Sequence, residues 1–426
     1  MLLYLSAKET RYAPVAQLDR VTGYEPVGRG FESLPAYQKE LTFRSALSFY
    51  TFGVRHYRKK QIYVMEDGKM SRIGEFCKRK NIVFSAKRYG IDALGAMAQG
   101  LFCSLLIGTI IKTLGAQLNI PFLTDIGSYA MAVSGPAMAV AIGYALQAPP
   151  MVLFSLAAVG WAANAEGGAG GPLAVLIIAI VAAECGKAVS KETKIDILVT
   201  PAVTILIGVA LAKWIAPPIG TAASAFGIVI DQATKLQPFW MGIAVSVLVG
   251  VALTLPISSA AICSVLGLTG LAGGAAVAGC CAQMVGFAVM SFKENRWGGL
   301  VSQGLGTSML QMPNIVRNPR IWIAPTVASA ITGPIATCIF KLEMNGAPIN
   351  SGMGTCGLCG PIGVWTGWLA PTEEAIAKGA QAISPTAFDW IGLALIAIVL
   401  PAVITPLLNM ICRKLGWVKD GDLTLS

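Results

Sequence analysis

Polar side chains inside apolar stretches are the first candidates for chemistry, because each is costly in a bilayer unless it faces a cavity or a partner. Asn164 and Glu166 stand in "WAANAEGGAGGP" (161–172), directly before a glycine-rich break. A helix is expected to begin at Pro172, since proline is favoured in the first turn. An amide and a carboxylate beside a broken helix end suit the hydroxyl groups of a polyol. We therefore predict that Asn164 and Glu166 are ligands of such a molecule.

Three further polar residues are embedded in apolar sequence, and each has two possible roles. Glu184, in "IVAAECGK", either forms an interfacial ion pair with Lys187 three residues on or accepts hydrogen bonds from a sugar. Gln283, in "GCCAQMVGF", either joins two helices or binds the ligand. Asn314, in "LQMPNIVRNPR", is a loop cap or a ligand contact. We include Glu184, Gln283 and Asn314 among the predicted substrate-binding residues.

Other kinds of chemistry lack their usual residues. The single histidine, His56, precedes all the apolar stretches, so the commonest metal ligand and a proton-relay imidazole are missing there. "GGAGGP" (167–172) lacks the Lys-Ser/Thr of a phosphate-binding loop. "TCGLCG" (355–360) contains a CxxC that could bind a metal or do redox chemistry, but no second pair or histidine accompanies it. We interpret it as small residues in a tight turn and predict neither metal nor cofactor.

The elements that position these residues are membrane helices. Only 13% of the 426 residues are charged, about half the share in soluble domains, and the mean hydropathy is +0.65. Apolar runs at 91–111, 239–255 and 390–411 approach or exceed the roughly 20 residues that cross a bilayer. The sequence therefore predicts an all-α polytopic membrane protein in a lipid bilayer.

About ten apolar segments are candidate spans, and several are short and interrupted by glycine and proline, which is typical of re-entrant hairpins. They are 91–115, 127–148, 150–163, 172–189, 196–216, 238–262, 275–292, 321–341, 358–370 and 388–412. Two patterns recur in the same order. "AMAVSGP" (130–136) resembles "ASAITGP" (328–334), and "GGAGGP" resembles "CGLCGP" (356–361). We predict an inverted repeat, which would place the substrate near the midplane between the two halves.

The distribution of Lys and Arg along the chain predicts how the protein is oriented in the membrane. Half of the net charge of +10 comes from residues 1–64, which hold ten Lys/Arg and five Asp/Glu, so the basicity does not indicate nucleic-acid binding. The other cations cluster in short loops at 78–80, 87–88, 187–194, 293–296, 317–320 and 413–414. Such loops are usually cytoplasmic. We expect a multi-pass protein of the bacterial inner membrane with both ends of the membrane region in the cytoplasm.

The first 69 residues resemble the translation of a bacterial transfer-RNA gene. Phe31-Glu32-Ser33 can be encoded by the invariant part of a T-arm, and "VAQLDRV" (15–21) by a D-arm. Our hypothesis is that residues 1–69 are a spurious, disordered extension and that the protein starts at Met65 or Met70. The alternative is a genuine cytoplasmic extension. The rest divides into an amphipathic cytoplasmic lead-in (70–90) on an anionic surface, a transmembrane domain (91–415) and a cytoplasmic tail (416–426).

Four stretches of this sequence resemble a known group. They are "KRKNIVFSAKRYGIDALGAMAQGLF", "GGPLAVLIIAIVAAECGKAVSKETKIDILVTP", "GTSMLQMPNIVRNPRIWIAPTVASAITGPIATCIF" and "NSGMGTCGLCGPIGVW". They resemble the membrane EIIC proteins of the bacterial phosphoenolpyruvate sugar phosphotransferase system, in the subfamily that includes perfringolysin-regulator-like proteins. The resemblance covers about residues 75–415. It implies a ten-helix inverted-repeat transporter, usually a homodimer, that moves a sugar which a IIB subunit phosphorylates at the cytoplasmic face.

The sequence departs from this group in two ways. Better-studied EIIC proteins use a histidine and a glutamate near the sugar, but only the glutamate has candidates here, Glu166 and Glu184. No soluble IIA or IIB domain is present, so separate subunits would supply the phosphate. We predict a sugar permease, at most the membrane subunit of a phosphotransferase. A membrane regulator or sensor with this fold, and an ion-coupled carrier of a small metabolite, are the alternatives.

Overall fold

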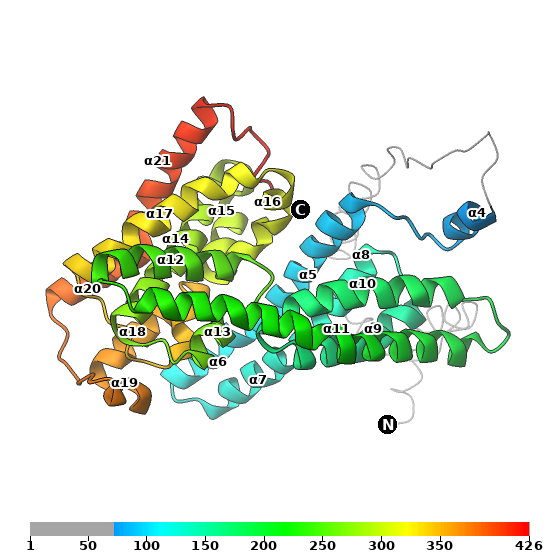
Figure 1. Cartoon of the computed structure of the whole chain (residues 1–426), viewed down its shortest axis with the longest axis horizontal. Coiled ribbons are helices and arrows are strands. Elements are labelled where there is room, and N and C mark those ends of the chain that lie inside the picture. The colour runs from blue at the N-terminus through cyan, green and yellow to red at the C-terminus, as the bar shows by residue number, and fades with distance from the viewer. Residues whose placement is uncertain (1–71, 426) are drawn as a thin grey trace, which may run out of the picture. The chain divides into compact units, whose positions relative to one another are not determined.

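The computed structural model describes residues 72–425 and shows an assembly of helices (Figure 1). Within this range the only extended pairing is one antiparallel bridge, between Gly270 and Met344. The prediction of an all-α polytopic membrane protein is confirmed. The predictions for residues 1–69, including the alternative starts at Met65 and Met70, fall outside the described residues.

The first part of the described chain contains a short amphipathic helix, a long helix assembled from four consecutive pieces, a bent pair, a hairpin and one very long helix. Their bounds are α4 (Arg72–Arg79), η2 (Arg88–Asp92), α5 (Ala93–Leu101), η3 (Phe102–Leu106), α6 (Ile107–Gln117), α7 (Pro121–Ala132), α8 (Ser134–Ala145), α9 (Pro150–Gly167), η4 (Gly168–Gly170), α10 (Gly171–Val189) and α11 (Asp196–Thr234). The lead-in predicted over 70–90 thus contains α4 and the start of the long helix.

The second part has shorter helices and more irregular connections. Their bounds are α12 (Pro238–Thr254), α13 (Ser259–Val265), α14 (Gly270–Met290), α15 (Phe292–Val301), η5 (Ser302–Gly306), η6 (Ser308–Gln311), α16 (Met312–Arg317), η7 (Pro319–Trp322), α17 (Ile323–Pro334), η8 (Ile335–Ile339), η9 (Pro348–Gly352), η10 (Cys356–Leu358), α18 (Cys359–Leu369), α19 (Glu373–Ala377), α20 (Ala387–Ala394), η11 (Leu395–Val399) and α21 (Leu400–Lys414).

Six helical stretches in the described range are long and apolar enough to cross a membrane, or seven if the pair α7 and α8, bent by 48°, is one span. One of the six, Pro150–Val189, is 40 residues long and folds back on itself. Its chain turns at Gly168, where φ is 48°. A Cβ on Gly186, near the end of α10, would lie 2.9 Å from Val152, near the start of α9. The two helices are therefore the limbs of a hairpin, each about 27 Å long at 1.5 Å per residue.

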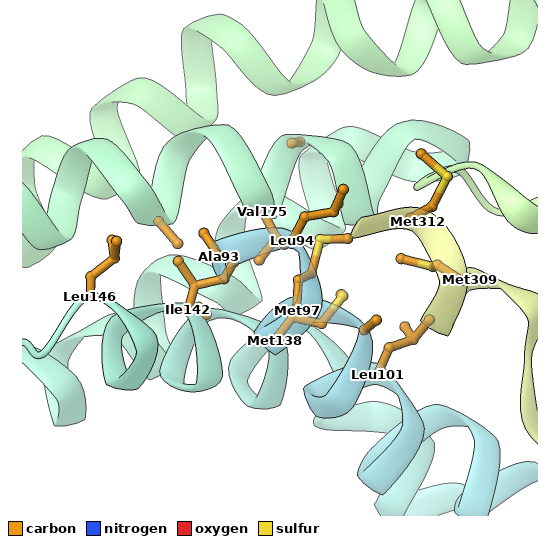
Figure 2. Close-up of a cluster of buried hydrophobic side chains, with 14 of the residues drawn as sticks. Ala93, Leu94, Met97, Leu101, Met138, Ile142, Leu146, Val175, Met309 and Met312 are labelled. Atoms are coloured by element: carbon orange, nitrogen blue, oxygen red, sulfur yellow. The ribbon is translucent and has the colours of Figure 1, made fainter. Parts of the chain in front are cut away.

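A large apolar core joins the first part of the chain to the segment before α16 (Figure 2). Leu94 and Met97 of α5 and Met138 of α8 point toward one another in this core, with Met309 and Met312 approaching from the η6–α16 segment. All five are buried. This packing fixes the long helix 88–117 between the α9–α10 hairpin and the second part of the chain, beside the site described below.

The second part is organised around α14, which is almost entirely buried. Small residues allow two helices to approach it and each other closely. A Cβ on Gly279 of α14 would lie 1.9 Å from the backbone oxygen of Ser246 in α12. A Cβ on Gly333 of α17 would lie 2.0 Å from the oxygen of Gly242, also in α12. Glycine at these crossings permits the close backbone contact that is common between membrane helices.

The repeated patterns adopt matching local structures. "GGAGGP" forms the turn η4 and opens α10, of which Pro172 is the second residue. "CGLCGP" forms the turn η10 and opens α18, of which Pro361 is the third residue. Both turns contain a glycine with positive φ, 48° at Gly168 and 52° at Gly357. The CxxC thus lies in a tight turn that leads into a helix. The inverted repeat of the two halves stays a prediction.

Candidate substrate-binding site

A cavity of about 70 Å³ lies where four irregular segments meet, one side of it closed by the long helix 88–117. The segments are the turn before α10, the connection between α12 and α13, the connection between η5 and η6, and the loop around η9 and η10. The lining residues used below are Pro172, Ser258, Ser259, Thr307, Gly352 and Cys356. Irregular backbone of this kind is tolerated at membrane depth only where protein buries it or where it lines a cavity.

Hydroxyl side chains replace the helical hydrogen bonds that these segments lack. Ser258 begins α13 from an extended conformation, and its side chain accepts a hydrogen bond of 3.2 Å from the backbone N–H of Ala261. Its own backbone N–H donates to the oxygen of Ala169 in η4, 2.8 Å away. Thr307 is also extended and accepts from the N–H of Met309 at 3.2 Å. Serine and threonine suit such positions because their oxygen satisfies an otherwise unpaired helix-end N–H.

Two more hydroxyls tie the segments together. Ser259 donates to the backbone oxygen of Gly352 at 2.7 Å, and Thr355 donates to the oxygen of Gly304 at 2.5 Å. The cavity lining contains hydroxyl and backbone groups, one thiol and apolar side chains, with no charged side chain among the described residues. Three hydroxyl side chains, of Ser258, Ser259 and Thr307, thus face a neutral and otherwise mostly apolar lining. At about 70 Å³ the cavity is smaller than the usual ligand pocket, so the segments must separate for a sugar to enter.

Gln283 lies behind the wall of this cavity, where it joins helices. Its side-chain oxygen accepts from the indole N–H of Trp322 at 3.0 Å and from the hydroxyl of Thr254 at 3.3 Å. The hydroxyls of Thr254 and Ser308 are 2.8 Å apart. Leu253 and Thr307, the neighbours of these two residues, line the cavity. The completely buried amide therefore supports the lining without being part of it.

Asn164 and Glu166 lie together at the end of α9, at the turn whose last residues lead into Pro172. A Cβ on Gly171 would lie 2.5 Å from the side-chain oxygen of Asn164. Asn164 forms no hydrogen bond with any residue that the structure describes, so its amide can accept a ligand. Glu166 is one-third exposed and forms an ion pair of 2.5 Å with Lys213 of α11. Neither residue lines the cavity; the nearest lining residue along the chain is Pro172, six residues after Glu166.

Glu184 and Asn314 lie elsewhere. Glu184 is near the other end of α10, where it forms the ion pair expected from its spacing, 2.8 Å from Lys187. Both carboxylate oxygens are buried, and neither has a hydrogen-bond partner in the described part of the chain. Asn314, on α16, donates to the side-chain oxygen of Gln311 at 2.8 Å and to the backbone oxygen of Thr424 at 2.9 Å. Its amide holds the C-terminal segment.

The five predicted residues thus occupy four places, and the structure brings only Asn164 and Glu166 together. The sequence prediction did not include the residues that line the cavity, because it relied on amide and carboxylate side chains. The available signal was the series of hydroxyl and glycine residues between apolar helices, "PISSAA" (256–261), "GLGTSM" (304–309) and "NSGMGTC" (350–356).

A second cavity, of about 230 Å³, is more polar, and three of its polar side chains are hydrogen-bonded within the protein. The amide of Asn345 donates to Glu343 at 2.9 Å and accepts from the N–H of Gly270 at 3.2 Å. Asp389 caps α20 through the N–H and hydroxyl of Thr386. The hydroxyls of the first cavity are bonded within the protein as well, so the first cavity is preferred because broken helices surround it.

Long apolar helices, interrupted by irregular segments around a cavity, define a multi-pass membrane protein of the kind that moves solutes. A family model described as "Phosphotransferase system, EIIC" matches residues 91–425. The chain belongs to this family, as its resemblance predicted, and is a permease component of a phosphotransferase system. No curated protein and no solved structure matches the chain.

Proposed function

We propose that this protein is the EIIC sugar permease of a phosphotransferase system and that it translocates a sugar which a separate IIB subunit phosphorylates. The observation that supports this most directly is the uncharged cavity among the broken helices, inside the region that matches the family; its mostly apolar lining includes the hydroxyls of Ser258, Ser259 and Thr307. Sugar hydroxyls both donate and accept hydrogen bonds, as do the side chains of Ser259 and Thr307.

Transport requires the walls of the cavity to move apart. One wall is the α9–α10 hairpin, through Pro172, and the opposite wall comes from the second part of the chain, through Ser259 and Gly352. We propose that a sugar binds between these walls when they separate, with Asn164 and Glu166 as additional ligands from the adjoining turn. We also propose a homodimer, in which the partner subunit would provide a fixed support for the walls of each cavity as they move.

The arrangement of cations supports a cytoplasmic side where a IIB subunit can approach. Lys80 and Lys187 lie at one cavity near α4, and Arg413 pairs with Glu294 at 2.5 Å near the C-terminal segment. The two groups lie on the same side, because η2 packs against α16. Cytoplasmic loops are enriched in Lys and Arg, so this side is proposed to face the cytoplasm and the inner membrane is the proposed location.

A thermal-shift screen of the purified full chain with sugars and sugar phosphates, combined with uptake in a deletion strain, tests this proposal. We expect one sugar to raise the unfolding temperature, and uptake to fall in the deletion strain and to require IIA and IIB. Uptake without these subunits would instead favour an ion-coupled carrier. No shift with any sugar and unchanged uptake would favour a membrane regulator.

Two serine variants make the site assignment specific. Ser259→Ala removes a lining hydroxyl and should lower the affinity for the sugar found in the screen. Ser264→Ala, on the exposed side of the same short helix, is the matched control and should leave the affinity unchanged. Equal affinity in both variants would contradict the assignment of this cavity.

A further inference from the structure

A third cavity, of about 400 Å³, lies where several helices end, and four of its nine lining residues are basic. Its lining comes from the end of α4, the connection between α8 and α9, and the end of α10. The residues are Arg79, Lys80, Asn81, Gln147, Pro149, Lys187, Ser190, Lys191 and Glu192. It is within the size range of ligand pockets and is separate from the cavity proposed for the sugar.

Positive charge exceeds negative charge in this lining. Glu192 is the single carboxylate among the lining residues, and it pairs with Arg79 at 3.0 Å and with Lys80. Lys187 is almost completely buried and pairs with Glu184 just outside the lining. The side chain of Lys191 forms no ion pair within 4.0 Å with any residue that the structure describes, although its backbone N–H donates to the carboxylate of Asp196 at 2.7 Å. The lining therefore attracts an anion.

The helix ends add negative partial charge, but cations cover them. The backbone oxygen of Leu146, at the end of α8, accepts hydrogen bonds from Lys187 at 3.1 Å and from Arg88. The oxygen of Ser190, at the end of α10, accepts from Lys80. The C-terminal end of each helix carries about half a negative charge. Lys187, Arg88 and Lys80 neutralise these ends, and Lys191 takes no part in those contacts.

Three residues of the lining adopt a backbone conformation that favours glycine. Asn81, Gln147 and Lys191 have φ of 54°, 54° and 61°, and they are three of the seven non-glycine residues with positive φ in the described range. Each lies two residues after the end of a helix, α4, α8 or α10, where glycine is the common choice. A side chain there costs roughly 1–2 kcal/mol.

These side chains present hydrogen-bond donors to the cavity. Asn81 donates to the side-chain oxygen of Gln147 at 2.6 Å. That contact orients the amide of Gln147, whose N–H groups have no partner among the described residues. Strained non-glycine residues that gather at one place are a recognised mark of a functional site. Gln147 and Lys191 thus carry side-chain donors that no described residue uses.

We propose that this cavity binds a phosphate group, carried either by the headgroup of an anionic phospholipid or by a free phosphate ester. Guanidinium, ammonium and amide N–H groups are the usual donor set for phosphate oxygens. Basic pockets between membrane helices bind lipid headgroups in this way. The amphipathic helix α4, whose last turn carries Lys78 and Arg79, would lie beside such a headgroup.

The test compares glycine variants of the full chain, purified in neutral detergent. Lys191→Gly and Gln147→Gly should raise the unfolding temperature without ligand, because glycine relieves the backbone cost. Both should weaken the stabilisation by phosphatidylglycerol, by about three- to tenfold in apparent affinity, because a donor to phosphate is lost. Asn119→Gly is the control. Asn119 has φ of 53°, lies two residues after the end of α6 and is exposed away from this cavity.

The ligands distinguish the two sources of phosphate. Stabilisation by phosphatidylglycerol but not by glycerol phosphate or phosphatidylcholine supports a lipid headgroup. Stabilisation by glycerol phosphate as well supports a free phosphate ester. The proposal is overturned if no phosphate compound stabilises the protein, or if Lys191→Gly and Gln147→Gly respond to phosphate in the same way as Asn119→Gly.

Discussion

The side-chain amide of Asn314 donates a hydrogen bond of 2.9 Å to the backbone oxygen of Thr424, and this contact ties α16 to the C-terminal segment. The neighbouring backbone oxygen, of Leu423, accepts from Gln311 at 2.9 Å and from Asn295 at 2.7 Å. The side chain of Leu423 is completely buried. The segment after α21 is therefore an integral part of the fold, held by amides that line its path.

Replacing Leu423 or Asn314 should destabilise the protein. Leu423→Ala leaves a cavity in a buried site and should cost about 2–5 kcal/mol. Asn314→Ala leaves the oxygens of Gln311 and Thr424 without a donor, which should cost about 1–3 kcal/mol. Thermal unfolding of the purified protein measures both. Thr424→Ala, which removes only an exposed side chain, should change stability by less than about 0.5 kcal/mol.

Ion pairs at the same segment predict a dependence on pH. Lys293, 2.9 Å from Asp420, lowers the pKa of this carboxyl below its ordinary value of 3.8, and Arg413 adds to the effect. A carboxyl with a lowered pKa stabilises the fold above its ordinary pKa, and the effect is lost as the pH falls through the lowered value. Asp420→Asn should therefore unfold at a lower temperature than the natural protein at neutral pH. The difference should vanish in strong acid, and a constant difference would contradict this account.

The hydrogen bond between Gln283 and Trp322 predicts a coupling between α14 and η7. Gln283→Leu should cost about 1–2 kcal/mol, because hydrogen bonds between membrane helices contribute about 0.6 kcal/mol on average and at most about 1.7. Trp322→Phe should cost less, since Thr254 still donates to Gln283. The double variant should be less destabilised than the sum of the two. Additive losses would show that this contact contributes no coupling energy.

The sequence was sufficient for the fold class because the charged fraction and the long apolar runs depend on the solvent around the protein. One local turn was also predicted correctly: α10 begins beside Pro172, after a glycine-rich turn. The two limbs of the α9–α10 hairpin were predicted as separate spans, 150–163 and 172–189, around a glycine-rich break. The backbone at Gly168 adds that the chain folds back at this break.

The site was harder to predict because a buried amide has the same sequence context whether it binds a ligand or the chain itself. Gln283 and Asn314 both proved to be hydrogen-bonded within the protein, and the partner of Asn314 lies 110 residues away. No local pattern predicts such a partner. The cavity hydroxyls come from four separate segments, so only tertiary packing brings Ser259 near Thr307 and Gly352.

The crossing of α12 and α14 should not tolerate a methyl group. Gly279→Ala would place a Cβ 1.9 Å from the backbone oxygen of Ser246, so the helices must separate, at a cost of about 1–3 kcal/mol or more. The measurement is the unfolding temperature and the yield of folded protein. Gly298→Ala, in α15 with no atom within 4 Å of the new Cβ, should instead gain up to about 1 kcal/mol from its higher helix propensity. Equal stability of the two variants would contradict the close contact.

The ion pair between Glu166 and Lys213 allows the proposed ligand role of Glu166 to be separated from a structural one. Both side chains are partly exposed, so the pair contributes at most about 1 kcal/mol to stability, and Glu166→Gln should fold normally. If its carboxylate binds the sugar, Glu166→Gln should lower the affinity about tenfold, because a charge-assisted hydrogen bond is lost. Lys213→Gln frees the carboxylate and should keep or raise the affinity. Titration of each variant with the sugar found in the screen measures this, and equal losses in both variants would assign the pair to the structure of the turn alone.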